Sequence, residues 1–365
     1  MMPENATAGP RLKASPLNLL HVIDGFGVGG AEMLVVTLLK NLKGYNLHLI
    51  VLGKPDTLVK EIPPFCKVTV LGFKTYRDLP SCALYIRRYI KKNKIQVVHS
   101  HLYWSNVATR LATPGDVHVF NCIHNISSMA SYTANRLSLY LEKLTYRKRH
   151  HIIAVSKTVL DDFNKWIGLK GPSTVLYNII GDEFFTAEPK NFFSKEKIKL
   201  VAVGNLRKQK NYPYMLKAFQ SMPPHVSLDI YGMGSLKENM ERDIAEHHLN
   251  ISLRGIQPNM HLVLREYDAF VMCSTHEGLS VALLEAMSSG LPAFLSDIPV
   301  QHESSENAAE YFDLDDPYAF VKKLLDTFDD VERLRQMSQL GIERAALMAR
   351  KENYIKKLEA LYIKA

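Results

Sequence analysis

Cysteine and long apolar runs are both scarce in this chain of 365 residues. The four cysteines, Cys66, Cys82, Cys122 and Cys273, show no CxxC spacing. The absence of such pairs argues against a disulfide framework. It indicates that the cysteines are buried thiols in a reducing compartment. No apolar run approaches the roughly 18–20 residues that span a bilayer. Residues 1–14 lack the apolar centre of a secretion signal, so we expect a disordered leader there and a cytoplasmic protein.

Positive charge is in excess: 45 Lys and Arg against 37 Asp and Glu give a formal net charge of +8. Nucleic acid, nucleotide phosphates and acidic lipid headgroups would all satisfy such a balance. Residues 84–94 and 139–151 concentrate the cations, and we expect both stretches to be helices with an apolar stripe and a basic face. They are either solvated surface helices or a surface that rests on the acidic inner face of the plasma membrane.

Short β-rich runs alternate with amphipathic helical segments along the whole chain, which predicts parallel α/β layers. The length suits two domains of ordinary size. We therefore predict an α/β protein of two Rossmann-like, doubly wound domains that face each other across a cleft, with ligands beyond the carboxyl ends of the strands. The expected strands lie at 17–24, 47–53, 67–73, 95–101, 117–124, 151–156, 198–204, 226–232, 251–255, 269–274 and 291–296.

A change in composition and periodicity along the sequence indicates the domain limits. Residues 178–198 carry Pro, Gly and charge without a clear period, which indicates a linker. We place the first domain at 15–182, the linker at 183–198 and the second domain at 199–340. The remaining residues, 341–365, are expected to form a C-terminal helix that packs back on the first domain.

The most informative segment is 270–292, FVMCSTHEGLSVALLEAMSSGLP. It reads as a buried strand, a loop and a helix that begins near Ser280, a suitable N-cap. The amides of Val281, Ala282 and Leu283 would then point out of the helix start and form an anion site for a diphosphate. Gly278 would let the anion approach the backbone closely.

Two glutamates flank this helix start. Glu277 precedes it in the loop, near whatever is attached to the phosphate, and Glu285 lies over a turn into the helix, where it could accept hydrogen bonds from a ribose. Alternatively, one is an exposed loop glutamate and the other only favours the helix.

The segment EGLSVALLE, with seven residues between Glu277 and Glu285, resembles the E-x7-E motif of retaining GT-B glycosyltransferases, family 4 in particular. The continuation AMSSGLPAFLSD is also similar, and the likeness extends over nearly the whole chain. The resemblance implies that Glu277 contacts the donor sugar and Glu285 the donor ribose, with Gly278, Leu279, Ser280 and Val281 in the donor site. It also implies a nucleotide sugar, with UDP-sugar favoured, and no cofactor or metal.

Two further loops of the second domain fit a donor site. In VAVGNLRKQKN, the cations Arg207 and Lys210 follow a strand and would stabilise a departing diphosphate, unless they are simply solvated. The family has Arg after the glycine, Gly204, where this chain has Asn205, so Arg207 is the candidate substitute. The resemblance also places the turn of Gly232 and Gly234 beside the donor. It places the nucleobase near Arg254, Gly255 and Ile256.

In the first domain, IDGFGVGGAE follows the first strand and opens a helix. It partly resembles a dinucleotide fingerprint, but no acidic residue ends the second strand to bind a ribose. The alternatives are a tight structural turn and the family's acceptor-side turn, here Gly29 and Gly30; we favour the latter.

Histidines end several first-domain strands. By the resemblance His124 contacts the donor sugar, and His101 lines the cleft on the acceptor side. A zinc site of His99, His101 and His124 has no cysteine or carboxylate partner at a supporting spacing, so we expect no metal.

The sequence thus predicts a retaining hexosyl- or N-acetylhexosaminyl-transferase acting on a glycan or lipid-linked acceptor, with no nucleic-acid partner. Two alternatives stay open. One is a sugar-nucleotide epimerase on the same fold. The other is a non-catalytic module that binds an anionic lipid or polymer.

Overall fold

The computed structural model describes residues 16–129, 136–186, 188–190 and 196–364. The leader expected at 1–14 lies outside these residues, and so do 187 and 191–195 of the expected linker. Within the described residues no helix combines the length and apolar character needed to cross a membrane.

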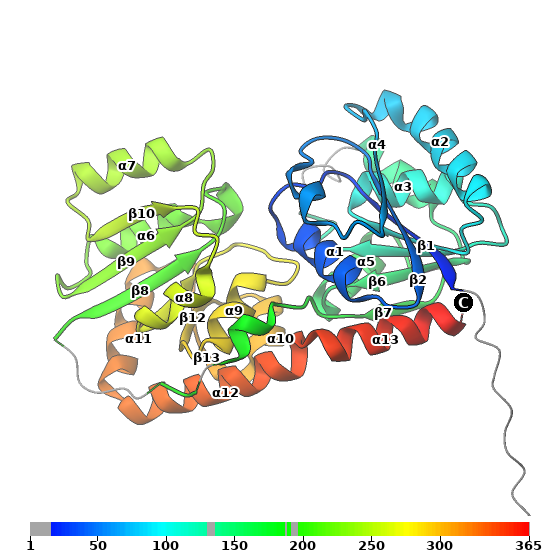
Figure 1. Ribbon diagram of the computed structural model, residues 1–365. Helices are drawn as coiled ribbons and strands as arrows, with labels where there is room; N and C mark the ends of the chain where they lie inside the picture. Colours follow the sequence, from blue (N-terminus) through cyan, green and yellow to red (C-terminus); the bar gives the residue numbers. More distant parts are fainter. Residues whose placement is uncertain (1–15, 130–135, 187, 191–195, 365) are drawn as a thin grey trace, which may run out of the picture.

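Two parallel sheets form the framework, and they lie side by side (Figure 1). The first has seven strands in the order β3-β2-β1-β4-β5-β6-β7, and the second has six in the order β10-β9-β8-β11-β12-β13. The strand order reverses beside β1 and again beside β8, which is the doubly wound topology that places ligands beyond the strand ends. The predicted fold class, two Rossmann-like α/β domains, is confirmed.

The strands of the first sheet are β1 Leu17–Ile23, β2 Tyr45–Val51, β3 Lys67–Val70, β4 Val97–His101, β5 His118–Ile123, β6 His150–Ala154 and β7 Ser173–Val175. Those of the second are β8 Ile198–Val203, β9 Val226–Tyr231, β10 Ile251–Gly255, β11 Ala269–Met272, β12 Ala293–Ser296 and β13 Ala309–Phe312. Central strands such as β4 and β11 are buried along their whole length, because helices cover both faces of a parallel sheet.

Helices connect the strands. Those of the first domain are α1 Gly30–Asn41, α2 Leu79–Lys92, α3 Tyr103–Ala112, α4 Arg136–Thr145 and α5 Lys157–Trp166. Those of the second are α6 Tyr212–Phe219, α7 Lys237–Glu246, α8 Met260–Val263, α9 Val281–Ser288, α10 Pro299–Ser305 and α11 Pro317–Asp329. Short 3₁₀ turns are η1 Thr57–Glu61, η2 Tyr76–Asp78, η3 Asp182–Thr186, η4 Lys208–Lys210, η5 Leu264–Glu266 and η6 Glu306–Ala308.

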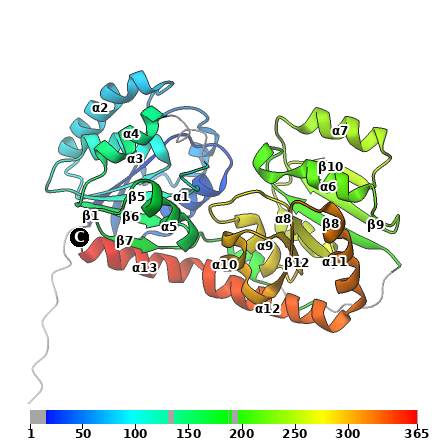
Figure 2. The same cartoon turned by 180° about the vertical axis from the view of Figure 1, so that it is seen from behind.

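The last two helices join the domains. α12 (Val331–Ala349) lies against the second domain, and α13 (Lys351–Lys364) continues beneath the first sheet, as both views show (Figures 1 and 2). Tyr354, Leu358 and Tyr362 of α13 are buried and share one apolar cluster with residues of both sheets. The chain therefore returns to the first domain at its end.

Three local expectations need correction. β7 and β13 were not predicted: β7 has only three residues, too few to show a period, and β13 has the sequence AEYF, with a glutamate inside a short strand. The stretch 139–151 is not one helix: α4 ends at Thr145, and β6 begins at His150 after a turn. Its two histidines belong to a strand of the sheet. The stretch 84–94 is helical as far as Lys92.

Candidate donor site

The start of α9 forms the base of the candidate site. Ser280 is the N-cap, and its Oγ accepts a hydrogen bond of 3.3 Å from the Leu283 amide. The Leu283 amide is therefore already used, contrary to expectation, and the amides of Val281 and Ala282 are the ones that lack an intrahelical acceptor. The N-terminus of an α-helix with two such amides attracts an anion such as a phosphate. The Leu279 side chain is buried, so only its backbone can face a ligand.

A lysine from a neighbouring loop lies next to this helix start. Lys210 Nζ is 2.8 Å from Glu277 Oε1, and both side chains are largely buried. A Cβ atom on Gly204 would lie 2.8 Å from Lys210 Cε, so the glycine leaves the room that the lysine side chain needs. The structure thus brings together the cation of one predicted loop and the carboxylate of another.

Gln209 holds these two loops in register, a role that the sequence did not indicate. Its side-chain Nε2 donates to the backbone carbonyl of His276 (2.9 Å), and its backbone carbonyl accepts from the Thr275 amide (2.9 Å). The turn after β9 is equally close: Cβ atoms on Gly232 and Gly234 would lie 2.0 and 2.4 Å from the carbonyl oxygens of Gly204 and Leu206. These glycines are required for backbone packing.

Arg207 and Asn205 are both exposed at the end of the same loop. Burial raises the pKa of Glu32, in the first domain, and the positive charge of Arg207 acts in the opposite direction. Arg207 is therefore near enough to Glu32 for their charges to interact, whereas Lys210 pairs with Glu277.

Glu285 is the most perturbed carboxyl in this region. Desolvation raises its pKa to about 8, and the nearby charge of Glu183 adds to this effect. The carboxyl is therefore mostly protonated at neutral pH when no ligand is bound. Two or more hydroxyl donors would favour the charged form instead.

The predicted nucleobase segment lies at the end of β10. Arg254 Nε is 3.0 Å from Asp229 Oδ1, and the Tyr267 hydroxyl donates to Asp229 Oδ2 (2.7 Å). Gly255 has a φ of +72°, which favours glycine, and its carbonyl accepts from the Gly232 amide. Ile256 is exposed beyond it. The segment therefore presents an exposed apolar side chain next to a fixed backbone turn.

The first domain meets this site directly. A Cβ atom on Gly278 would lie only 2.0 Å from the His124 carbonyl oxygen, and one on Gly30 would lie 3.2 Å from Val281 Cγ2. Gly29 precedes Gly30 as the residue before α1. The Ser156 hydroxyl donates to the Gly278 carbonyl (2.7 Å). The turn before α1 and the end of β5 thus contact the loop that carries Glu277 and the start of α9.

Another contact between the domains was not foreseen. The Glu303 carboxylate accepts hydrogen bonds from the Lys157 and Thr158 amides and from the Thr158 hydroxyl, at the start of α5. It adds to the cap that this helix already has, in which the Ser156 hydroxyl accepts from the Val159 amide (3.1 Å). No local sequence pattern indicates this pairing, because the partners are about 145 residues apart.

His101 and His124 belong to a larger group of imidazoles. His21, His99 and His101 are fully buried, and ring contacts connect them across β1 and β4. Their ligand-type nitrogens lie within 4.8 Å of one another, as do those of His101 and His124 with the Cys122 sulfur. Cys122 thus lies beside His101 and His124, although no cysteine partner was expected for these histidines; neither set includes a carboxylate. The imidazoles also bond to one another, which uses some of the same lone pairs.

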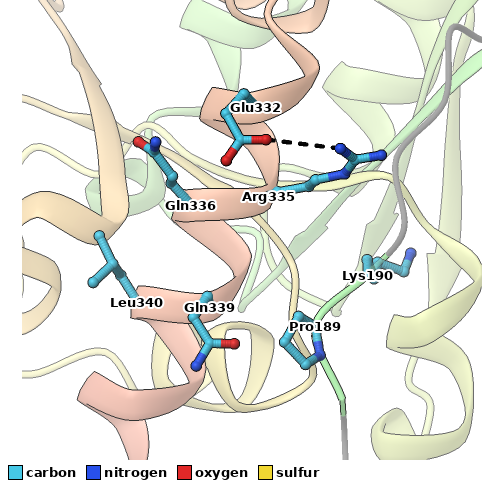
Figure 3. A pocket seen from close by; sticks show the side chains of 7 residues that line it. All are labelled: Pro189, Lys190, Glu332, Arg335, Gln336, Gln339 and Leu340. Atoms are coloured by element: carbon cyan, nitrogen blue, oxygen red, sulfur yellow. Dashed lines mark ion pairs between the residues drawn. The ribbon is translucent and has the colours of Figure 1, made fainter.

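A separate cavity of about 430 Å³ lies between α12 and the segment of Pro189 and Lys190 (Figure 3). Its lining includes an ion pair between Arg335 and Glu332. None of the predicted donor or acceptor residues lines it. We do not assign the reaction to this cavity.

Comparison with known families supports the interpretation of the region around Lys210, Glu277 and α9 as a donor site. The model described as Glycosyltransferase Family 4 matches residues 28–184, and the model Glycosyl transferases group 1 matches residues 183–344. The two matches are consecutive and together extend over most of the chain. The chain belongs to glycosyltransferase family 4, and it is a nucleotide-sugar glycosyltransferase of the GT-B fold.

Two known proteins are similar to this chain in sequence, and a solved structure is similar to it in fold. The chain is 27% identical over 154 residues, 41% of this chain, to a UDP-N-acetylglucosamine–peptide N-acetylglucosaminyltransferase GtfA subunit of Streptococcus agalactiae, but spans only 30% of its length. It is 25% identical to an N-acetylgalactosamine-N,N'-diacetylbacillosaminyl-diphospho-undecaprenol 4-alpha-N-acetylgalactosaminyltransferase of Campylobacter jejuni, over 75% of this chain and 79% of that protein. The structure of HepE from Anabaena with UDP and glucose superposes with a TM-score of 0.80, at 13% identity, over 96% of this chain and all of that one.

Proposed function

We propose that this protein transfers a hexosyl or N-acetylhexosaminyl group from a UDP-sugar to a glycan or lipid-linked acceptor, with retention of the anomeric configuration. The main observation in support is that Lys210 pairs with Glu277, which lies in the loop just before the start of α9. A leaving diphosphate needs that combination of a cation and free amides. A module that only binds a polymer has no need for it.

The residues divide the work as follows. As the bond between the anomeric carbon and the phosphate oxygen breaks, negative charge grows on the UDP oxygens. Lys210, Arg207 and the amides of Val281 and Ala282 stabilise that charge. Glu285 accepts from the ribose hydroxyls, and Glu277 and His124 hold the sugar. The acceptor oxygen attacks from the same face, and its proton passes to the departing phosphate.

Contact between the domains serves the same reaction. The Gly278 loop lies against the His124 backbone, so bound sugar would be shielded from water on that side. Exclusion of water suppresses hydrolysis of the donor and favours transfer. The acceptor would enter from the first domain, past Gly29 and Gly30.

The acceptor's lipid suggests where the enzyme works. α4 exposes Leu137, Tyr140 and Leu144 beside Lys143, and α2 exposes its own apolar and basic side chains. We propose that these helices rest on the acidic cytoplasmic face of a membrane. Co-sedimentation with vesicles of anionic lipid, and none with neutral vesicles, tests this. Equal binding to both kinds would refute a role for the basic side chains.

The function is tested by incubating the protein with a panel of UDP-sugars and with lipid diphosphate acceptors. We expect UDP release that depends on the acceptor, and a product whose new bond has the same anomeric configuration as the donor by NMR. Conversion of the sugar without an acceptor would indicate the epimerase instead. Failure of all nucleotides to bind would indicate the binding module.

A further inference from the structure

The start of α5, in the first domain, bonds to two separate elements of the second domain. Its N-cap, Ser156, donates from its hydroxyl to the Gly278 carbonyl (2.7 Å), in the loop before α9. The next two residues, Lys157 and Thr158, donate to the Glu303 carboxylate on α10. α5 and α10 lie side by side in both views (Figures 1 and 2). Three consecutive residues of one helix end thus contact both the loop before α9 and α10.

Both oxygens of the Glu303 carboxylate take part in this contact. Oε1 accepts from the Lys157 amide, and Oε2 accepts from the Thr158 amide (2.9 Å) and from the Thr158 hydroxyl (2.7 Å). The first amides of a helix have no intrahelical acceptor, and that end of the helix carries a partial positive charge. A carboxylate therefore makes stronger hydrogen bonds here than a neutral side chain would.

The Glu303 carboxylate is also held from both domains. Arg344 of α12 donates from Nη2 to the Glu303 backbone carbonyl (2.7 Å) and from Nε to the Ser304 carbonyl (3.2 Å). In the first domain, burial raises the pKa of Tyr177, and the charge of Glu303 and a hydrogen bond to its carboxylate act in the same direction. α12 thus fixes the end of α10, and a tyrosine of the first domain adds to the contact.

The same helix end connects Glu303 to the candidate donor site. Ser156 precedes Lys157 directly, and its bond to Gly278 brings the first domain against the loop before α9. That loop also packs on the His124 carbonyl oxygen, from which a Cβ atom on Gly278 would lie only 2.0 Å. Loss of the Glu303 bonds would release the start of α5 from α10, so the first domain would be held to the donor site by fewer bonds.

We propose that Glu303 is a positioning residue for the transfer reaction, whose bonds to the start of α5 set how the first domain closes over the loop before α9. Glu303 acts through Ser156 and Gly278 and does not touch the donor. The proposal rests on the proposed function for the reaction that closure serves, whereas the contact itself does not. Closure keeps water from the donor. When closure is weakened, water attacks the anomeric carbon in place of the acceptor hydroxyl, and the products are free sugar and UDP.

Small-angle X-ray scattering of the unliganded protein tests the contact without any turnover. We expect a larger radius of gyration in Glu303→Ala, and a smaller increase in Thr158→Val, which loses one of the bonds. Glu306→Ala is the matched control, because the Glu306 carboxylate pairs with Arg344 inside the second domain (2.9 Å). If Glu303→Ala does not fold, Thr158→Val carries the same test. An unchanged radius of gyration, or an equal increase in Glu306→Ala, would overturn the proposal.

Kinetics with the UDP-sugar that the protein accepts provide the second test. We expect Glu303→Ala to lower kcat for transfer about 10-fold and to raise the share of donor that is hydrolysed. The affinity for UDP should change little, because the UDP site belongs to the second domain. The double variant with Thr158→Val should lose no more than Glu303→Ala alone, since both substitutions remove the same contact.

Two results would refute the positioning role of Glu303. One is a loss in the double variant equal to the two single losses combined, and the other is an unchanged share of hydrolysis in Glu303→Ala. Absence of turnover with every nucleotide sugar would refute the proposed function alone, since the scattering result stands separately.

Discussion

Lys210 Nζ and Glu277 Oε1 form an ion pair of 2.8 Å between two loops that are 67 residues apart in the sequence. The pair lies beside the start of α9 and is mostly screened from solvent. A bound diphosphate would compete with Glu277 for the Lys210 ammonium group. In the free protein, the ion pair with Glu277 holds this group next to the proposed diphosphate site. The lysine is already ordered before the donor arrives.

Removal of this cation should impair chemistry more than donor binding. We expect Lys210→Ala to lower kcat about 100-fold, because a charge that stabilises the departing diphosphate matters most in the transition state. Steady-state kinetics measure the change. Lys208→Ala is the control, since Lys208 is an exposed cation on the same turn. Equal effects of the two variants would contradict a specific role for Lys210.

UDP affinity should depend on the charge of Glu285. The pKa of this carboxyl is about 8 in the free protein, and hydrogen bonds from ribose hydroxyls would lower it in the complex. Binding then requires loss of a proton, so affinity should rise about 10-fold between pH 7 and pH 9 and level off above that. Calorimetry at several pH values measures this. Glu285→Gln should bind more weakly and lose the dependence; a pH-dependent affinity that survives in this variant would contradict the assignment.

Gly278→Ala should impede contact between the domains. Its Cβ would lie 2.0 Å from the His124 carbonyl oxygen, which belongs to the backbone and cannot turn away. We expect at least about a 10-fold loss of kcat with nearly unchanged binding of UDP alone. Gly115→Ala is the control, because a Cβ there meets nothing within 4 Å. Full activity of Gly278→Ala would show that the contact is not needed.

A buried ion pair in the first domain allows a prediction about stability. Arg110 Nη1 donates to Glu142 Oε1 (2.7 Å), and both side chains are almost fully buried. Glu142→Ala leaves the guanidinium without its carboxylate, although Arg110 Nε still donates to Asn121 Oδ1 (2.7 Å). The unpaired charge should reduce the free energy of unfolding by about 3–5 kcal/mol. Denaturant unfolding measures the change. The double variant with Arg110→Met should be more stable than Glu142→Ala alone; if it is less stable, the penalty does not come from an unpaired charge.

The sequence predicts the fold and family well because both depend on local patterns. Alternating strands and helices give the α/β class, and the spacing of Glu277 and Glu285 carries the family resemblance. Ser280 caps α9 as its position suggested. Each of these features can be recognised from residues that lie close together in the sequence.

Other features depend on contacts that no local pattern encodes. The bond from Gln209 to the loop of His276, the Glu303 contact with α5 and the ring contacts of His21 all join distant segments. The perturbation of Glu285 is likewise a matter of burial and of Glu183, which enters from η3. A strand of three residues such as β7 has too few positions to show a period.

Titration of UDP into the free protein tests the central claim most directly, because the account places the diphosphate between Lys210 and the start of α9. Calorimetry should show one site per chain in the unaltered protein and in Lys208→Ala, and binding at least about 10-fold weaker in Lys210→Ala. ADP and GDP serve as comparison ligands. If no nucleoside diphosphate binds, or if UDP binds Lys210→Ala as tightly as the unaltered protein, the assignment of the donor site is wrong.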